Sequence, residues 1–134
     1  MFRILYPLKD ATIYDRYPEL NSGIDQILEL TKNTEGNVYQ YVDDPEATYA
    51  QTFNSRILIK FDITPIQTII QENPNCRFNC KLNLYNTEAN SNPIDYTIAV
   101  YPLAEDWRNG TGNYNDDPIV KNGVCWYYKS SAVT

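Results

Sequence analysis

The chain has 134 residues, with 17 Asp and Glu against 11 Lys and Arg, no His and a formal net charge of −6 at pH 7. This length allows one domain with a real core, and the negative charge disfavours nucleic acid as a partner. Without His the chain lacks the commonest general base and zinc ligand, so we expect that it is not an enzyme.

Long apolar segments are missing from the sequence, and we expect no membrane span. The first residues lack the apolar stretch of a signal peptide, which predicts synthesis and folding in the cytoplasm. The three Cys form an odd set, which favours a reducing environment over a disulfide framework. One of them, Cys80, alternates with apolar neighbours and is expected to be a small buried hydrophobe.

Apolar and polar residues alternate with a period of two in the first half of the chain, which predicts β-strands over residues 11–17, 26–31 and 55–63. In the third strand the alternation separates a core face from a partly wet face. The core face has Ile57, Ile59, Phe61 and Ile63, and the wet face has Arg56, Leu58, Lys60 and Asp62. The segment 37–54 is too long for a simple hairpin loop and predicts an additional β excursion.

One short helix is predicted over residues 65–72. Thr64 can cap this helix, Pro65 suits its first turn, and three Ile residues share one stripe. The strand pattern then returns over 78–85 and 94–103, with a turn between them.

The segment 104–118 is rich in Gly, Asn and Asp, which predicts a long surface loop anchored by Trp107 and Tyr114. A last, aromatic strand is expected over 123–128. Short strands with turn-rich joints predict an all-β fold, an antiparallel β-sandwich that forms one domain over residues 1–134. Because no closing strand follows the aromatic one, we expect this domain to be the N-terminal portion of a longer protein, or a partner to complete its sheet.

Several aromatic residues are candidates for binding. Trp107 could stack on a sugar ring, or it could plug the base of the loop against the sheet. An aromatic platform for glycan or for a protein partner could be formed by Tyr101, Tyr114, Trp126, Tyr127 and Tyr128.

Two acidic pairs could offer Ca²⁺ the oxygen ligands that it prefers. Asp116 and Asp117 form one pair, Asp43 and Asp44 the other, and each pair is followed by Pro. Asp-Asp-Pro is also ordinary turn chemistry. We therefore expect no metal and no cofactor, with calcium at Asp116 and Asp117 as the alternative.

Residues 10–23, 55–63 and 80–85 resemble, in this order, the opening strands and turn of DNRLRE-type β-sandwich domains, a jelly-roll family akin to carbohydrate-binding modules. The more specific likeness is the run Glu-Asp-Trp-Arg-Asn-Gly-Thr-Gly at 105–112, followed by Asp-Asp-Pro and by Gly-Val-Cys-Trp at 123–126. This version is similar to domains in structural proteins of tailed bacteriophages.

The resemblance implies a non-enzymatic structural component of a bacteriophage virion: a neck, tail, fibre or capsid-accessory module. Such a module would be made in the host cytoplasm, would be located in the virion and would dock onto other virion structural proteins in a homo- or hetero-oligomeric assembly. The alternative is a carbohydrate-binding module that recognises host or extracellular glycan through Trp107 and Tyr114. A third interpretation is the non-catalytic part of a larger hydrolase.

Overall fold

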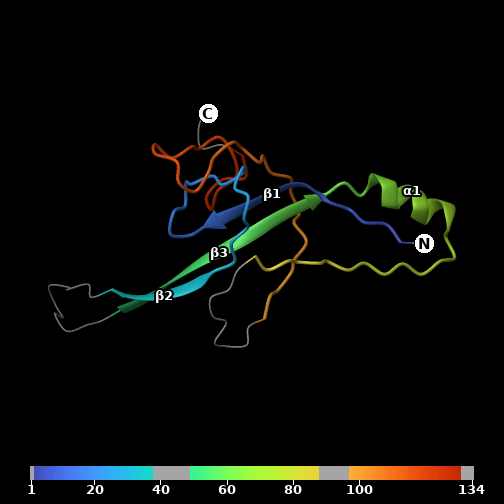
Figure 1. Ribbon diagram of the computed structural model, residues 1–134, viewed down its shortest axis with the longest axis horizontal. Helices are drawn as coiled ribbons and strands as arrows, with labels where there is room; N and C mark the ends of the chain where they lie inside the picture. Colours follow the sequence, from blue (N-terminus) through green and yellow to red (C-terminus); the bar gives the residue numbers. More distant parts are fainter. Residues whose placement is uncertain (1, 38–48, 88–96, 131–134) are drawn as a thin grey trace. The chain divides into compact units, whose positions relative to one another are not determined.

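The computed structural model describes residues 2–37, 49–87 and 97–130. These residues contain three strands and one helix, which are β1 (Pro7–Tyr14), β2 (Lys32–Asn37), β3 (Tyr49–Phe61) and α1 (Thr64–Glu72) (Figure 1).

The chain divides into two compact units. The first unit combines Met1–Asp62 with Glu105–Thr134 and carries the sheet, and the second unit is Ile63–Ala104 and carries α1.

β3 is the central strand of an antiparallel sheet, with β1 on one side and β2 on the other (Figure 1). β2 and β3 pair as a hairpin from Lys32, opposite Asn54, to Asn37, opposite Tyr49. Asp43 and Asp44, the second candidate calcium pair, lie outside the described residues. The antiparallel all-β class with one short helix, predicted from alternation, is therefore confirmed.

The core lies on the sheet face that was predicted to be partly wet. It consists of Ala11, Trp107 and Val124, with Ile13 and Leu58 packed against them. Ala11 lies opposite Leu58 in the ladder, so the two side chains share a face. The predicted core residues Ile57 and Ile59 lie on the other face and are half-buried. The assignment of faces was wrong because both faces of β3 carry apolar side chains, and only the packing of the C-terminal segment decides between them.

Ser22 covers part of the outer edge of β1. Its hydroxyl donates to the Thr12 carbonyl (2.7 Å) and accepts from the Thr12 N–H (2.9 Å). Both residues are buried, so an edge-strand residue has its two backbone groups satisfied without a neighbouring strand. The turn that follows β1 thus packs back on that strand.

The buried amide of Asn21 joins this turn to the C-terminal part of the first unit. Its Nδ2 donates to the carbonyls of Asn109 (2.7 Å) and Val124 (2.9 Å), and its Oδ1 accepts from the Gly112 N–H (2.8 Å). A Cβ at Gly110, where φ is +81°, would lie 2.3 Å from Asn21 Oδ1. Glycine is required there both by the backbone conformation and by the close approach of the amide.

Residues 26–31, predicted as the second strand, are irregular, and β2 begins only at Lys32. The N–H groups of Glu29 and Thr31 donate to the side-chain hydroxyls of Thr12 (3.0 Å) and Ser55 (2.7 Å). Because side chains satisfy these backbone groups, the segment does not need to pair with a neighbouring strand. The prediction was therefore wrong in placing a strand there.

The predicted aromatic strand over 123–128 is likewise not a strand. Its backbone bonds belong to a tight turn and to the neighbouring loop: Cys125 N–H donates to the Tyr128 carbonyl (2.9 Å), and Val124 N–H donates to the Arg108 carbonyl (2.7 Å). Alternation of apolar and polar residues indicates that one face of a segment is buried. An irregular segment packed on a sheet can bury one face as well, so the pattern does not require a strand.

In the second unit, α1 confirms the helix predicted over 65–72. Its N-cap is Ile63 rather than Thr64, and at its end Asn73 Nδ2 donates to the Ile69 carbonyl (2.9 Å).

No strand forms over 78–85 or over residues 97–103, the described part of the segment predicted at 94–103. The side chains that alternate there are exposed, Cys80 included, so the expected burial of Cys80 was wrong. Alternation predicts a pleated segment, but a strand also needs a neighbour to pair with, and the described residues of this unit provide none.

Within the described ranges, no helix combines the length and the hydropathy that crossing a membrane requires.

Candidate functional site

A pocket of about 180 Å³ lies in the first unit, at the end of β1 and beside the β2–β3 hairpin. Four aromatic residues line it, namely Tyr14, Tyr17, Phe53 and Tyr114. The polar lining consists of Asp15, Arg16, Glu29, Thr31, Asn33 and Asn54. We call this the tyrosine pocket.

Three tyrosine rings meet in the tyrosine pocket. The ring centroids of Tyr14 and Tyr114 are 5.2 Å apart at an interplanar angle of 59°, and those of Tyr17 and Tyr114 are 5.9 Å apart at 81°. Tyr14 is 7% exposed, whereas Tyr17 is 38% and Tyr114 is 40% exposed. Tyr14 therefore supports the cluster from beneath, and the other two rings keep surface available for a ligand.

Arg16 lies over two of the aromatic rings. Its guanidinium carbon is 5.0 Å from the ring centroid of Phe53 and 5.8 Å from that of Tyr17, within the range of cation–π attraction. The stacking holds a planar group with several N–H donors at the pocket wall.

Glu29 reaches the pocket because the segment before β2 is irregular. Its Oε2 accepts from the Tyr14 hydroxyl (3.0 Å), and its backbone carbonyl accepts from the Ser55 hydroxyl (2.7 Å). Each carboxylate oxygen has two lone pairs, so the bond from Tyr14 leaves Glu29 with acceptor capacity for a ligand.

Asp15 extends the contact between β1 and β3 past the end of β1. Its Oδ1 accepts from the Asn54 N–H (2.8 Å), its Oδ2 accepts from Asn54 Nδ2 (3.2 Å), and its own N–H donates to the Asn54 carbonyl (3.1 Å). Both carboxylate oxygens of Asp15 are thus used in shaping the pocket.

Tyr114 is held at the pocket by Asp25, from the segment after β1, and by the turn of its own loop. Its N–H lies 3.2 Å from both carboxylate oxygens of Asp25. The turn around Tyr114 is closed by Asp116, whose Oδ2 accepts from the Asn113 N–H (2.7 Å) and whose N–H donates to the Asn113 carbonyl (3.1 Å). Polar side chains therefore fix the backbone that carries this exposed aromatic ring.

Burial raises the pKa of the Tyr14 hydroxyl above its ordinary value, and the hydrogen bond to Glu29 raises it further. Burial also raises the pKa of the Tyr114 hydroxyl, and the interaction of this hydroxyl with the Tyr17 side chain raises that pKa further. Both hydroxyls consequently stay protonated at neutral pH and remain available for hydrogen bonding. Burial raises the pKa of the Asp25 carboxyl, and the negative charges of its neighbours Glu29 and Asp116 add to the rise.

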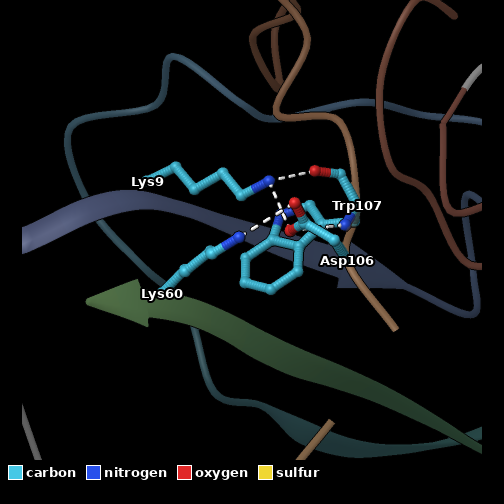
Figure 2. Close-up of polar contacts among 4 residues, drawn as sticks. All are labelled: Lys9, Lys60, Asp106 and Trp107. Atoms are coloured by element: carbon cyan, nitrogen blue, oxygen red, sulfur yellow. Dashed lines mark hydrogen bonds and ion pairs between the residues drawn. The ribbon is translucent and has the colours of Figure 1, made fainter. Parts of the chain in front are cut away.

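The base of the loop is fixed by a second cluster, at the core face of the sheet. Figure 2 shows Lys9 and Lys60 converging on the Asp106 carboxylate. Lys9 Nζ lies 2.8 Å from Asp106 Oδ1, and Lys60 Nζ lies 2.9 Å from Asp106 Oδ2. Lys9 also donates to the Trp107 carbonyl and lies 4.5 Å from the centroid of the Trp107 ring. Asp106 Oδ1 accepts from the Trp107 N–H (2.9 Å).

This cluster places Trp107 inside the protein. The side chain is 8% exposed, belongs to the core and lies against Lys9, so its ring has no face open to a sugar in this structure. The hydrogen bonds from Lys9 and Lys60 hold the pKa of Asp106 well below its usual range.

A model of carbohydrate-binding module family 96 matches residues 2–125, nearly the whole chain. The chain belongs to this family. No curated protein and no solved structure matches the sequence. The match bears out the likeness to carbohydrate-binding modules that the sequence motifs indicate, whereas the DNRLRE type and the virion context remain predictions.

The tyrosine pocket of this family 96 module includes one of the predicted binding residues, Tyr114. Trp126 is half-buried, with the Arg56 guanidinium 4.8 Å from its ring centroid. Tyr127 is 64% exposed and packs edge-on against its neighbour, and Tyr101 is exposed in the second unit. Within the first unit, Tyr114, Trp126 and Tyr127 therefore have different neighbours.

The predicted calcium ligands lie in the loop that carries Tyr114. Asp116 bonds the backbone of its own turn, and Asp117 is exposed. In the part of the chain that the structure describes, no three acidic, His or Cys side chains gather closely enough to hold a metal ion. Asp116 acts here as a turn residue, and calcium at Asp116 and Asp117 stays a prediction.

The sequence analysis named only Tyr114 among the residues that line the pocket. It missed the four residues at the end of β1 and the residues before and in the β2–β3 pairing, namely Glu29, Thr31, Asn33, Phe53 and Asn54. The signal was the run Tyr14-Asp15-Arg16-Tyr17, in which two aromatic residues and two charges precede Pro18. Aromatic rings and charged hydrogen-bonding groups can together bind a sugar. The same run also fits the end of a β-strand, which is how the sequence analysis interpreted it.

Proposed function

We propose that this family 96 module is a non-catalytic domain that binds carbohydrate in the tyrosine pocket. The observation that carries the proposal is the meeting of three tyrosine rings with the hydrogen-bonding groups of Arg16 and Glu29 in one depression. Membership of a carbohydrate-binding module family supports glycan as the ligand class.

The pocket offers a sugar both kinds of contact that it needs. The C–H face of a pyranose ring is apolar and packs on aromatic rings, here Tyr17 and Tyr114. The hydroxyl groups at its rim would donate to the Glu29 carboxylate and accept from the Arg16 guanidinium, which are charge-assisted hydrogen bonds. Because hydrogen bonds to Asp25 already hold the Tyr114 backbone, the entropy cost of ordering this loop on binding is small.

The carboxylates of the pocket are arranged for binding rather than for hydrolysis. Glycosidases use two carboxyl groups on either side of the scissile bond, one as an acid and the other as a base or nucleophile. Here both carboxylate oxygens of Asp15 accept hydrogen bonds from Asn54, and Glu29 accepts one from the Tyr14 hydroxyl. This supports a module without catalytic activity of its own.

Substitution of the two exposed rings tests this proposal. Tyr17→Ala and Tyr114→Ala should each weaken binding to the glycans that the wild-type protein retains on an array, by about tenfold, because each removes one packing surface. Tyr127→Ala is the matched control, since Tyr127 is exposed outside the pocket. Equal retention of all three variants, measured at a temperature where circular dichroism shows them folded, would contradict the proposal.

The virion role remains a separate prediction that rests on the sequence resemblance. Glycan binding and virion assembly are compatible, because a module docked on a particle can still present the tyrosine pocket. Mass spectrometry of purified phage particles tests the location: peptides of this chain should be found there, and their absence would leave glycan binding as the function.

A further inference from the structure

We propose that Asp25 is a positioning residue of the tyrosine pocket: as a carboxylate it holds the Tyr114 backbone at the pocket, and its protonation releases that backbone and weakens glycan binding. The inference rests on the proposed function, because Tyr114 is one of the two rings on which the sugar would pack. It is carried by a bond between two segments distant in sequence and by the like charges around the Asp25 carboxylate.

The Tyr114 N–H bonds the turn of its loop to another segment. The N–H groups of Asn113, Asn115 and Asp116 bond inside the turn. They donate to Asp116 Oδ2 (2.7 Å), to Asn113 Oδ1 (3.1 Å) and to the Asn113 carbonyl (3.1 Å), respectively. The Tyr114 N–H instead lies 3.2 Å from both carboxylate oxygens of Asp25. Because the acceptor is ionised, this bond is charge-assisted and stronger than a bond to a neutral group.

The backbone around Asp25 is fixed without help from its carboxylate. The Asp25 N–H donates to the carbonyl of buried Ser22 (3.2 Å), and the Ile24 N–H donates to the Gly112 carbonyl (3.1 Å). Protonation of the Asp25 side chain leaves these backbone bonds in place. Its direct effect is therefore on the contact with Tyr114.

The charges that face Asp25 are negative. They belong to Glu29, from the segment before β2, and to Asp116, from the loop of Tyr114. Burial raises the pKa of the Asp25 carboxyl, the bond from the Tyr114 N–H lowers it, and the two carboxylates raise it further. The surroundings thus disfavour the ionised form of Asp25, and the Tyr114 N–H is the group that favours it.

The other ionisable groups beside Tyr114 keep their charge while Asp25 titrates. The Tyr14 hydroxyl at the end of β1 interacts with the Asp25 charge, and its raised pKa keeps it protonated. The guanidinium of Arg16, which acts on the Tyr114 hydroxyl, stays protonated at every pH of interest. Glu29 is present in both the wild type and an Asp25 variant, so a comparison of the two at each pH isolates Asp25.

Ionisation of Asp25 has opposite consequences for position and for stability. A carboxyl with a raised pKa in the folded state stabilises the fold fully below the unfolded pKa, and this stabilisation disappears as the pH rises through the folded value. A neutral side chain at position 25 should therefore free Tyr114 without lowering the melting temperature. Replacement of a residue with a merely structural role would lower affinity and melting temperature together.

Asp25→Asn tests the inference at neutral pH, because it removes the charge and keeps the shape of the side chain. Hydrogen exchange of the full chain, followed by NMR, should show the Tyr114 N–H exchanging about tenfold faster, since its charge-assisted bond becomes a neutral one. In calorimetry with an array oligosaccharide that the wild type retains, affinity should fall about fivefold, less than in Tyr114→Ala because the ring is still present. The melting temperature should equal or exceed that of the wild type.

Asp10→Asn is the matched control for this variant. It removes the same charge from the same unit, in β1, and should change neither the exchange of the Tyr114 N–H nor the affinity.

The wild-type protein gives a second measurement that needs no substitution. Between about pH 7 and pH 4, its affinity should approach that of Asp25→Asn as the pH falls, because Asp25 becomes neutral. The Tyr114 amide proton resonance should move over the same range toward its position in Asp25→Asn. The lowered pKa of Asp106 keeps that carboxylate ionised there, so its ion pairs with Lys9 and Lys60 persist.

The outcomes separate the inference from the proposed function. Unchanged Tyr114 exchange in Asp25→Asn, or an affinity difference that is constant at every pH, would overturn the inference, while weaker binding by Tyr114→Ala would keep the tyrosine pocket as a glycan site. A melting temperature that falls together with affinity in Asp25→Asn would make Asp25 a structural residue only. Retention indifferent to Tyr17→Ala and Tyr114→Ala would overturn the proposed function, and with it the effect of Asp25 on binding.

Discussion

At the scale of single residues, two buried side chains fix the segments that build the tyrosine pocket. Asn21 uses its amide to hold the carbonyls of Asn109 and Val124 and the N–H of Gly112. Trp107 fills the core beneath Lys9. Both residues stand near the predicted turn and loop, but their role in joining distant segments requires contacts that the sequence does not specify.

Trp107→Ala should destabilise the fold without removing a ligand contact. The indole is part of the core, so its loss leaves a cavity and is expected to lower the free energy of unfolding by about 3 kcal/mol. Urea denaturation measures this loss, and glycan titration well below the melting temperature should give an affinity close to that of the wild type. Unchanged stability with lost affinity would instead make Trp107 the sugar platform.

At the scale of elements, alternation identified β1 and β3, and a stripe of three Ile residues identified α1. Alternation failed where strand pairing or packing was needed to decide. It cannot distinguish the two faces of β3, since Ile57 and Leu58 are both apolar. It also placed strands in segments whose backbone is bonded to side chains or turns, as at Glu29 and Cys125. At Glu29 the deciding hydrogen bond comes from Thr12, which is distant in sequence, whereas at Cys125 it is a local turn to the Tyr128 carbonyl.

The outer edge of β1 gives a prediction at this scale. Ser22→Ala removes the hydroxyl that bonds both backbone groups of buried Thr12, and leaves a donor and an acceptor unsatisfied. We expect a loss of about 2 kcal/mol in the free energy of unfolding. Urea denaturation measures it, with Ser130→Ala at an exposed position as the control. Equal stability of both variants would mean that water replaces the Ser22 hydroxyl at the edge.

At the scale of the whole molecule, the stability of the first unit depends on pH through the ionisation of Asp106. The two lysines that converge on Asp106 lower the pKa of this carboxyl from its ordinary value of 3.8. A carboxyl with a lowered pKa in the folded state stabilises that state above the unfolded pKa, and the stabilisation disappears as the pH falls through the folded value.

Asp106→Asn should therefore lower the melting temperature at neutral pH, and the difference from the wild type should shrink below about pH 4. Thermal unfolding followed by circular dichroism between neutral pH and about pH 2 measures the difference. Asp10→Asn is the control, because Asp10 is an acidic residue of the same strand, β1, outside this cluster. A constant difference at every pH would show that the ion pairs with Lys9 and Lys60 do not stabilise the fold.

The sequence by itself determined the class of this protein. Three local patterns were enough to predict an antiparallel all-β domain with one short helix: period-two alternation, one apolar stripe after a proline, and a loop rich in Gly and Asn. They were enough because each pattern depends only on neighbours along the chain. The loop motif also indicated a relation to carbohydrate-binding modules, which the family match bears out.

Only the tertiary structure decided which aromatic residues could meet a ligand. Trp107 and Tyr114 lie in one loop, yet the first is buried under Lys9 and the second lines a pocket with Tyr14 and Tyr17. Their exposure depends on which sheet face the loop covers, and that is settled by long-range packing and hydrogen bonds such as those of Asn21. Local pattern fixes the elements, whereas burial is a property of the assembled chain.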